Sequence, residues 1–373
     1  MVATRLQSVR QQSGYSAARV IRLLCERAAA RDIPVMTEAS LKVKLSRWEN
    51  GRETVSQPYR QLFREIYGRT NTELGFPPEQ DADPDAEELI TRLDRARSVD
   101  AEAVRLFRQQ VDHARRVDRQ FGALTQLDQL RSHISQVEDL LGYSTAGTAR
   151  TQLAGVLAEA SALAGWEALD RNAIRQAWQH HETAKAAARE AESPALLAHA
   201  TAQQAFILTD LDHPQAAVDQ LAHARTLAEH TAPALLRAWL AAAHGEGLAA
   251  TGHREGALRA FDQAASLLPD DPTDPELPFL FLGGAHLDRW RGHALARLGE
   301  HEAIDQLTNA LPRLPTDFTR ARTAMLVDLA YAHAAAGDAS TARDYARQAR
   351  RLASQITSDR QLRRLGSLIL PTR

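Results

Sequence analysis

A turn signal recurs in the C-terminal part of the chain, and it constrains the fold more than any other feature. In each full copy a turn is followed five residues on by an alanine, and one copy is a residue shorter. The copies follow one another at steps of 40, 47 and 38 residues. Repetition at such steps is typical of stacked helix hairpins. The copies are Leu211–Val218, Thr251–Leu258, Leu298–Ile304 (the short one) and Ala336–Arg343.

Each turn leads into a helix rich in Ala and Leu, so each copy is interpreted as the corner of a helix hairpin. An earlier pair, Arg150 to Trp166 and Asn172 to Ala191, supplies the first unit, and about five units fit into residues 148–373. Small residues let the helices approach closely, and stacking buries each unit's apolar face against the next. The four prolines from Pro269 to Pro278 predict a loop between units three and four.

The composition agrees with an all-α protein. Aromatic residues are 5% of the chain and apolar residues 44%, a balance that favours packed helices over β-sandwiches. A single cysteine, Cys25, excludes a disulfide framework and a cysteine zinc site. The sequence has no apolar signal region at its N-terminus and no run of 18 apolar residues, so a cytoplasmic protein without membrane contact is expected.

Residues 1–78 predict a separate domain of four or five short helices. Its most informative stretch is Thr37 to Arg52, which as a helix places Leu41, Leu45 and Trp48 on one face before Asn50-Gly51 ends it. Trp48 is expected in the core, and Glu49 is expected to have a partner within the domain. The outward face carries Ser40, Val43, Arg47 and Asn50, with Lys42 and Lys44 on its flanks.

Charge is distributed unevenly along the chain. Residues 1–75 hold 13 Lys and Arg against 7 Asp and Glu, whereas the remainder holds 32 against 40. A small basic domain on an acidic body indicates contact with a polyanion. The alternative is that charges merely cluster on a solvated surface.

The stretch Ser46-Arg47-Trp48-Glu49-Asn50-Gly51-Arg52 resembles the end of the recognition helix in Cro/repressor-type (XRE) helix-turn-helix domains. The following Tyr59-Arg60-X-Leu62…Tyr67-Gly68…Glu73-Leu74-Gly75-Phe76 fits a subgroup of these proteins, and residues 148–373 resemble tetratricopeptide-like repeats. The link from Ala30 to Met36 is longer than the family's minimal turn.

The resemblance implies an N-terminal helix-turn-helix domain (1–78) that binds operator DNA, joined to an α-solenoid. Arg47 would then read guanine and Val43 a thymine methyl, while the lysines and Arg52 bind phosphate. The alternative is a small protein-binding helical domain. The DNA-facing residues implied are Ser40, Lys42, Val43, Lys44, Arg47 and Arg52.

Residues 79–147 are interpreted as a linker followed by connector helices. Glu79 to Asp85 is acidic, contains Pro84 and predicts the linker. Apolar residues then follow steps of three and four along one helix, which indicates either an ordinary core helix or a dimer contact. Those residues are Leu127, Leu130, Ile134, Val137 and Leu141.

The first helices of the hairpins are expected to line a concave groove, a surface that in such arrays commonly takes peptides. Aromatic residues in this set are also explained by packing alone. The predicted groove residues are Gln203, Phe206, Trp239, His244, Arg289, Trp290 and His293.

The sequence predicts binding and no catalysis. It carries no phosphate loop, no Gly-X-Ser-X-Gly elbow and no His-Glu-X-X-His motif, and no cofactor or metal is expected. Adjacent His180 and His181 point about 100° apart on a helix and do not share an ion readily. The combined expectation is a homodimeric transcriptional regulator whose repeats sense a peptide or small signalling ligand. The alternative is a tetratricopeptide scaffold that docks proteins and does not bind DNA.

Overall fold

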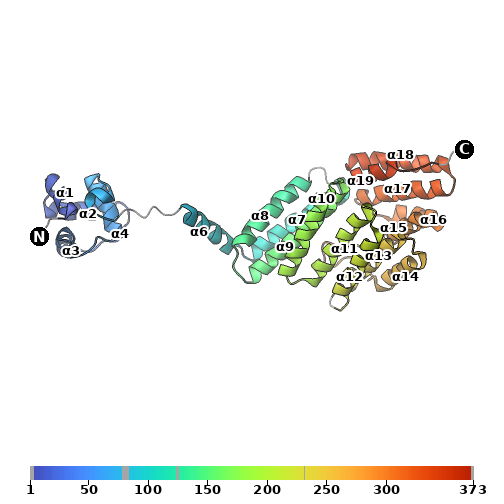
Figure 1. Cartoon of the computed structure of the whole chain (residues 1–373), viewed down its shortest axis with the longest axis horizontal. Helices are drawn as coiled ribbons and strands as arrows, with labels where there is room; N and C mark the ends of the chain where they lie inside the picture. Colours follow the sequence, from blue (N-terminus) through green and yellow to red (C-terminus); the bar gives the residue numbers. More distant parts are fainter. Residues whose placement is uncertain (1–3, 78–83, 123–125, 231, 371–373) are drawn as a thin grey trace. The chain divides into compact units, whose positions relative to one another are not determined.

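The computed structural model describes residues 4–77, 84–122, 126–230 and 232–370, and these residues form helices and connecting segments without a strand (Figure 1). The chain divides into two compact units, Met1–Ile90 and Thr91–Arg373. The boundary falls inside α6 (Pro84–Arg97). The predicted linker begins with residues 79–83, which lie outside the described residues.

The first unit is a cluster of short helices whose starts are fixed by hydroxyl side chains. Thr4, Ser16, Thr37 and Thr70 each accept a hydrogen bond from a backbone N–H of the first helical turn. These caps satisfy donors that have no partner within the helix. The helices are α1 (Arg5–Gln12), α2 (Ala17–Ala29), α3 (Glu38–Glu49), α4 (Gln57–Tyr67) and α5 (Asn71–Leu74).

Helix α3 is anchored by the three residues that the sequence predicted. Leu41, Leu45 and Trp48 are at most 4% exposed. The Trp48 ring lies 5.0 Å from the ring of Tyr59 and 5.9 Å, edge-on, from that of Phe63, both on α4. Such aromatic contacts add to simple area burial and fix the rotation of α3 about its axis.

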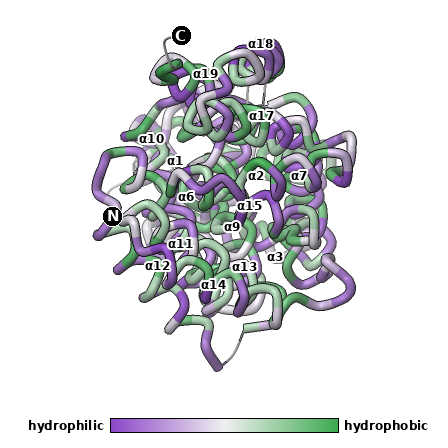
Figure 2. The backbone as a smooth tube through the Cα atoms, turned by 90° about the vertical axis from the view of Figure 1, so that its right-hand side faces the viewer, coloured by the Kyte–Doolittle hydropathy of each residue, from purple (hydrophilic) through white to green (hydrophobic). Residues whose placement is uncertain are grey.

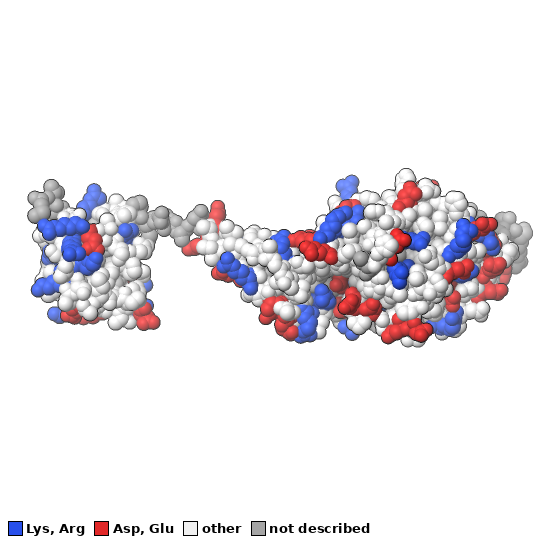
Figure 3. Space-filling view, turned by 90° about the horizontal axis from the view of Figure 1, so that it is seen from below, with Lys and Arg blue, Asp and Glu red and all other residues white. Residues whose placement is uncertain are grey.

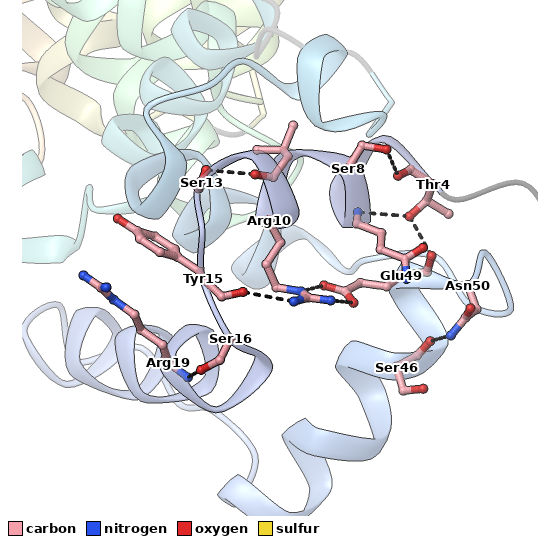
Figure 4. A network of polar contacts seen from close by, with 12 residues as sticks. Thr4, Ser8, Arg10, Ser13, Tyr15, Ser16, Arg19, Ser46, Glu49 and Asn50 are labelled. Carbon is pink, nitrogen blue, oxygen red and sulfur yellow. Dashed lines mark hydrogen bonds and ion pairs between the residues drawn. The ribbon is translucent and has the colours of Figure 1, made fainter.

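A polar network also holds α3 in place (Figure 4). Arg10 of α1 donates two hydrogen bonds to the Glu49 carboxylate, at 2.6 and 2.9 Å, and a third to the carbonyl of Tyr15. The Thr4 hydroxyl donates to the Glu49 carbonyl at 2.8 Å. The expectation that Glu49 has a partner inside the domain is therefore confirmed.

The second unit contains the five predicted helix hairpins, stacked in chain order as tetratricopeptide-like units of an α-solenoid. Helices α7 (Ala101–Phe121) and α8 (Gln126–Tyr143) precede them, and α19 (Asp359–Gly366) follows. The hairpins are α9 (Thr148–Asp170) with α10 (Ile174–Glu190), α11 (Pro194–Asp210) with α12 (Pro214–Ala228), α13 (Ala234–Ala250) with α14 (Arg254–Leu267), α15 (Gly284–Arg297) with α16 (Glu302–Ala310) and η1 (Leu311–Arg313), and α17 (Thr319–Ala335) with α18 (Ala339–Gln355).

The recurring turn signal is the corner of each hairpin. A residue with positive φ follows the first helix: Asn172 in the first hairpin, then Asp212, Gly252, Gly299 and Gly337. The next N–H bonds back to a carbonyl five residues earlier, as from His213 to Leu208 at 2.8 Å. This is the hydrogen-bond pattern of a Schellman motif, which explains why the signal centres on Gly and Asp.

Small residues permit the close helix approach that the sequence predicted. A Cβ atom added at Gly292 of α15 would lie 2.6 Å from the side chain of Leu307 on α16. One added at Gly165 of α9 would lie 2.7 Å from the His181 ring on α10. Helix α18 is more polar than its hairpin partner α17 and buries only Ala342, Ala349 and Ala353 (Figure 2).

Helices α7 and α8 belong to the core of the second unit. Leu130, Ile134, Val137 and Leu141 are at most 5% exposed and pack in one cluster with α9. The interpretation of the apolar row as an ordinary core helix is confirmed. Within the described part of the chain, every helix is too short or too polar to cross a membrane.

Candidate ligand-binding cavity

The inner faces of the first hairpin helices converge on a cavity of about 290 Å³ in the second unit. On each helix the lining residues recur at spacings of three and four, which defines one helical face. On α11 they are His199, Gln203, Phe206 and Asp210, and on α15 they are His286, Arg289, Trp290, His293 and Arg297.

Six of the seven predicted groove residues line this cavity, and their role in binding remains a prediction. They are Gln203, Phe206, Trp239, Arg289, Trp290 and His293. The seventh predicted residue, His244, does not line the cavity, which corrects its place in the predicted set. It precedes the lining residue Glu246 by two positions, about 200° around α13, and its ring is hydrogen-bonded at 2.9 Å to Arg225 of α12.

Aromatic side chains from four hairpins form a continuous wall of the cavity. The Trp290 ring lies 5.6 Å from that of Trp239 and 6.2 Å from that of Phe206. Phe206 in turn meets the ring of Trp166 at 6.2 Å. The rings therefore pack on one another and also face the cavity, so packing and lining are not exclusive explanations.

The proline-rich insertion contributes lining residues that the sequence interpretation missed. Leu277, Leu280 and Leu282 are at most 4% exposed and anchor the segment in the core. The alternate residues Phe279 and Phe281 line the cavity. The alternating Leu and Phe after Pro278 was the available signal, because a solvated loop does not carry such a pattern.

Buried ionic contacts join the two ends of the solenoid around the cavity. Arg320 of α17 pairs with Asp118 of α7 and, at 2.6 Å, with Asp170 of α9. The hydroxyl of Ser358, the residue before α19, donates to Asp170 at 2.6 Å. Arg360 of α19 donates two hydrogen bonds to Asp210, at 2.6 and 2.8 Å. These contacts connect residues at least 150 positions apart and close the repeat array into a ring.

Several carboxyl groups near the closure have strongly altered proton affinities. Burial raises the pKa of Glu167 to about 9, so this side chain is protonated at neutral pH. Burial also raises the pKa of Asp118, against the opposing charge of Arg320. Burial alone would lower the pKa of Arg320, but the charges of Asp118 and Asp170 outweigh it and raise the value.

A second ionic group lies between α13, α15 and α17. The His293 ring lies 2.8 Å from a carboxylate oxygen of Asp328 and 3.3 Å from one of Glu246. Burial would lower the pKa of His293, but these two carboxylates outweigh it and raise the value. Asp328 also accepts a hydrogen bond from Arg364 at 2.6 Å through the same oxygen, Oδ1, whereas its Oδ2 is buried without a hydrogen-bond partner among the described residues.

The DNA-facing residues implied by the resemblance lie on the outer face of α3 and just beyond it. Ser40, Lys42 and Arg52 are exposed, and Val43 is 54% exposed, which is high for a β-branched apolar residue. Figure 3 shows a group of Lys and Arg on the visible face of this unit, with acidic side chains beside it and along the lower edge.

The sequence interpretation missed a carboxylate beside this face of α3. Glu53 pairs with Lys44 and lies 3.7 Å from Arg47. The hydrogen bond from Lys44 lowers the pKa of Glu53, which is therefore ionised at neutral pH. Two of the six implied DNA-facing residues thus already have an anionic neighbour.

No family model and no curated protein matches this sequence. Among solved structures, a Rap protein complexed with competence and sporulation factor has a TM-score of 0.49 at 14% identity, covering 95% of this chain and 99% of that one. BtubC (BKLC) from P. vanneervenii has a TM-score of 0.42 at 14% identity, covering 66% and 94%. A putative Podospora anserina kinesin light chain with nearly identical TPR-like repeats has a TM-score of 0.34 at 16% identity, covering 52% and 94%.

Proposed function

We propose that this chain is a helical-repeat binding protein whose second unit holds a peptide or small-molecule ligand inside its ring. The carrying observation is the cavity, whose walls come from all five hairpins' first helices and from α7 and α19. A ligand there touches both ends of the repeat array at once. Binding would therefore stabilise the closed ring, since a ligand favours the state that offers its contacts.

The chemistry of the walls supports binding of a ligand with both apolar and charged parts. Cavities that bind small molecules combine an apolar lining with a few placed polar groups. Here Trp239, Trp290 and Phe206 supply the apolar lining, and the arginines and carboxylates around the cavity supply the polar groups. Such a set exceeds what packing requires, because buried ion pairs are costly to desolvate and contribute little net stability.

The test fills the cavity with a larger side chain and measures which small molecules remain bound to the purified protein. Ala324 of α17 lines the cavity, so Ala324→Trp occupies it, whereas Ala265 of α14 is exposed and Ala265→Trp serves as the matched control. Mass spectrometry of small molecules released on denaturation should find a compound with the native protein and the control that is absent from Ala324→Trp. Identical profiles for all three proteins would contradict the proposal.

We propose sequence-specific DNA binding by the first unit as a second function. The observation that favours DNA binding is the exposed apolar side chain of Val43. It lies on the well-packed helix α3, which also carries Ser40, Lys42 and Arg47. In this proposal Ser40, Val43 and Arg47 meet base edges, while Lys42, Lys44 and Arg52 meet phosphates. Protein docking through the same face is the competing role.

Binding to genomic DNA fragments over a salt series separates the two roles. A regulator should select discrete sites, with log affinity falling linearly in log salt. Arg47→Ala should weaken the selected site by roughly 1–3 kcal/mol if Arg47 reads a base. Arg69, exposed and paired with Glu73, provides Arg69→Ala as the control. Equal affinity for all fragments would leave the docking role.

A homodimer is part of the DNA-binding proposal. One such helix unit binds DNA weakly, and two-fold operators match two units spaced by about one DNA turn. Ligand binding in the ring would then change DNA affinity only by favouring one spacing of the two units over another. Sedimentation of the full chain with and without operator DNA measures the oligomeric state that this requires.

A further inference from the structure

Most charged residues that line the cavity are already paired with one another. Seven arginines and six carboxylates line it, although residues 76–373 as a whole carry more acidic than basic side chains. Four arginines have carboxylate partners: Arg115 with Glu159, Arg320 with Asp118, Arg360 with Asp210, and Arg364 with Asp328. Among the described residues, the other three, Arg119, Arg289 and Arg297, make no ion pair.

Arg289 is the most deeply placed of these three. Its Nε atom is buried and has no hydrogen-bond partner among the described residues, and its guanidinium lies 5.7 Å from the centre of the Trp290 ring. Burial lowers the pKa of Arg289, against the charges of Glu246 and Asp328. Those two carboxylates are already engaged by His293 and Arg364. Arg289 is therefore a buried cation without a direct carboxylate partner among the described residues, and an incoming anion would supply one.

Arg119 approaches the same corner of the cavity from α7. Its guanidinium lies 5.2 Å from the ring centre of Phe318 and 5.9 Å from that of Phe281. Arg119 is half-buried, and the surrounding rings exclude water from one side of its charge. The aromatic faces hold the guanidinium in position without neutralising it, which leaves its N–H donors for another group.

His286 lies one helical turn before Arg289 on α15 and shares its two aromatic neighbours with Arg119. Its ring is 6% exposed and contacts the rings of Phe318 and Phe281 at 4.6 and 4.9 Å. Its Nε2 atom is buried without a hydrogen-bond partner among the described residues. Burial and the charges of Arg289 and Arg119 lower the pKa of His286 to about 3, so the ring is neutral.

We infer that Arg119, Arg289 and His286 form an anion subsite that binds the carboxylate of the ligand, with the ligand's apolar body against Trp290 and Trp239. The inference rests on the proposed ligand cavity and names its ligand class: a carboxylate attached to an aromatic or aliphatic body. Two arginines and one neutral imidazole match a single oxyanion, because they supply donors for both carboxylate oxygens. The aromatic wall beside them excludes a ligand that is charged throughout.

A matched pair of fluorescent probes tests the subsite. The probes are 8-anilino-1-naphthalenesulfonate and its uncharged parent, N-phenyl-1-naphthylamine, titrated into the full-length protein. The sulfonated probe should bind the native protein more tightly. The double variant Arg119→Gln/Arg289→Gln should lose roughly tenfold or more of that affinity, as expected for lost charge-assisted hydrogen bonds. Arg259→Gln, on an exposed arginine paired with Glu255 outside the cavity, should change nothing.

The uncharged probe separates the two proposals. If it binds native and double-variant protein equally while the sulfonated probe loses its advantage, the subsite is supported and the variant is folded. If both probes bind the native protein equally and the variant does not change this, the subsite is wrong and the cavity stands. If neither probe binds, the proposed cavity function is wrong as well.

Displacement of the sulfonated probe then distinguishes two sources of the carboxylate. The competitors are 1-naphthoate, the dipeptide acetyl-Leu-Phe with a free C-terminus, and the same dipeptide as its C-terminal amide. Displacement by the dipeptide acid but not by its amide assigns the subsite to a peptide C-terminus. Displacement by naphthoate alone assigns it to a small acid. Failure of both acids overturns the assignment to a carboxylate.

Discussion

The two units of this chain use aromatic and charged residues in opposite ways. In the first unit Trp48, Tyr59 and Phe63 form the core, and the basic side chains of α3 point outward. In the second unit alanines fill most helix contacts, while Trp239 and Trp290 turn toward an internal cavity. In the second unit the large aromatic side chains therefore line an interior surface, whereas in the first unit they fill the core.

The difference shows how residue size determines where a helical protein can bind. Alanine interfaces bring helices close together and leave the larger side chains to face the centre of the ring, where they cannot fill all the space. The described helices of the first unit meet around one hydrophobic cluster. The binding surface that we propose for this unit is therefore the outer face of α3.

The largest expected effect comes from opening the ring. Arg320→Met removes the partner of the buried carboxylates Asp118 and Asp170 and should lower the free energy of unfolding of the second unit by about 3–5 kcal/mol. Urea unfolding followed by hydrogen exchange in each unit measures this. The exposed Arg259→Met should have almost no effect, and an equally small loss for Arg320→Met would contradict the role of the ion pairs in closure.

Acid should weaken the second unit selectively, because all 14 histidines lie beyond residue 90. Burial holds the pKa of His181, His199 and His286 near 3 and that of His244 near 4. Below about pH 6.5 the unfolded chain binds protons that these folded rings exclude, so stability falls as pH falls.

Glu167, with its pKa raised to about 9, opposes this trend because the folded unit already holds its proton. The raised pKa values of Asp118 and His293 act in the same direction. The net loss between pH 6.5 and 5.5 should be roughly 1–3 kcal/mol. Hydrogen exchange at the two pH values, corrected for intrinsic rates, should show the loss in α9–α15 and not in α1–α5. Equal changes in both units would refute the explanation.

A smaller effect should follow from widening one hairpin. Gly292→Ala places a methyl group 2.6 Å from Leu307 and should destabilise the second unit by about 1–3 kcal/mol. The matched control is Gly142→Ala on α8, where the added methyl meets nothing within 4 Å. The control should gain up to about 1 kcal/mol from helix propensity. Thermal unfolding compares them, and the same sign for both would contradict close packing at Gly292.

The smallest effect concerns the outer face of the first unit. Glu53→Gln frees Lys44 and Arg47 from their anionic neighbour, so DNA affinity should rise slightly at low salt. Glu73→Gln, at another exposed ion pair of the same unit, is the control. Fluorescence anisotropy with a selected DNA site measures both, and a loss of affinity for Glu53→Gln would show that Glu53 positions these cations rather than masking them.

The sequence predicted the local features of this fold well. The end of α3 at Asn50-Gly51 and the hairpin corners at Asp212 and Gly252 are encoded within a few residues. The rotation of α11 and α15 was also predictable, because Gln203 and Phe206 share one face of α11, and Trp290 and His293 share one face of α15. The prediction for His244 was wrong because this residue, five positions after Trp239, lies on another face of α13.

Closure of the ring was not predictable in the same way. Whether Arg320 reaches Asp118 depends on the curvature summed over five hairpins, and small differences in each contact add up over that length. The same holds for Arg119 of α7 and Arg289 of α15, which line one cavity although their helices are far apart in sequence. Their positions are fixed by packing between helices, which local sequence patterns do not determine.

The location of a bound ligand tests the central claim most directly. A crystal structure of the full chain with 8-anilino-1-naphthalenesulfonate should show the sulfonate within hydrogen-bond distance of Arg289 and the naphthalene ring against Trp290. Dye bound only on the outside of the repeats, with the cavity unoccupied, would contradict the account of the second unit as a ring that binds its ligand inside.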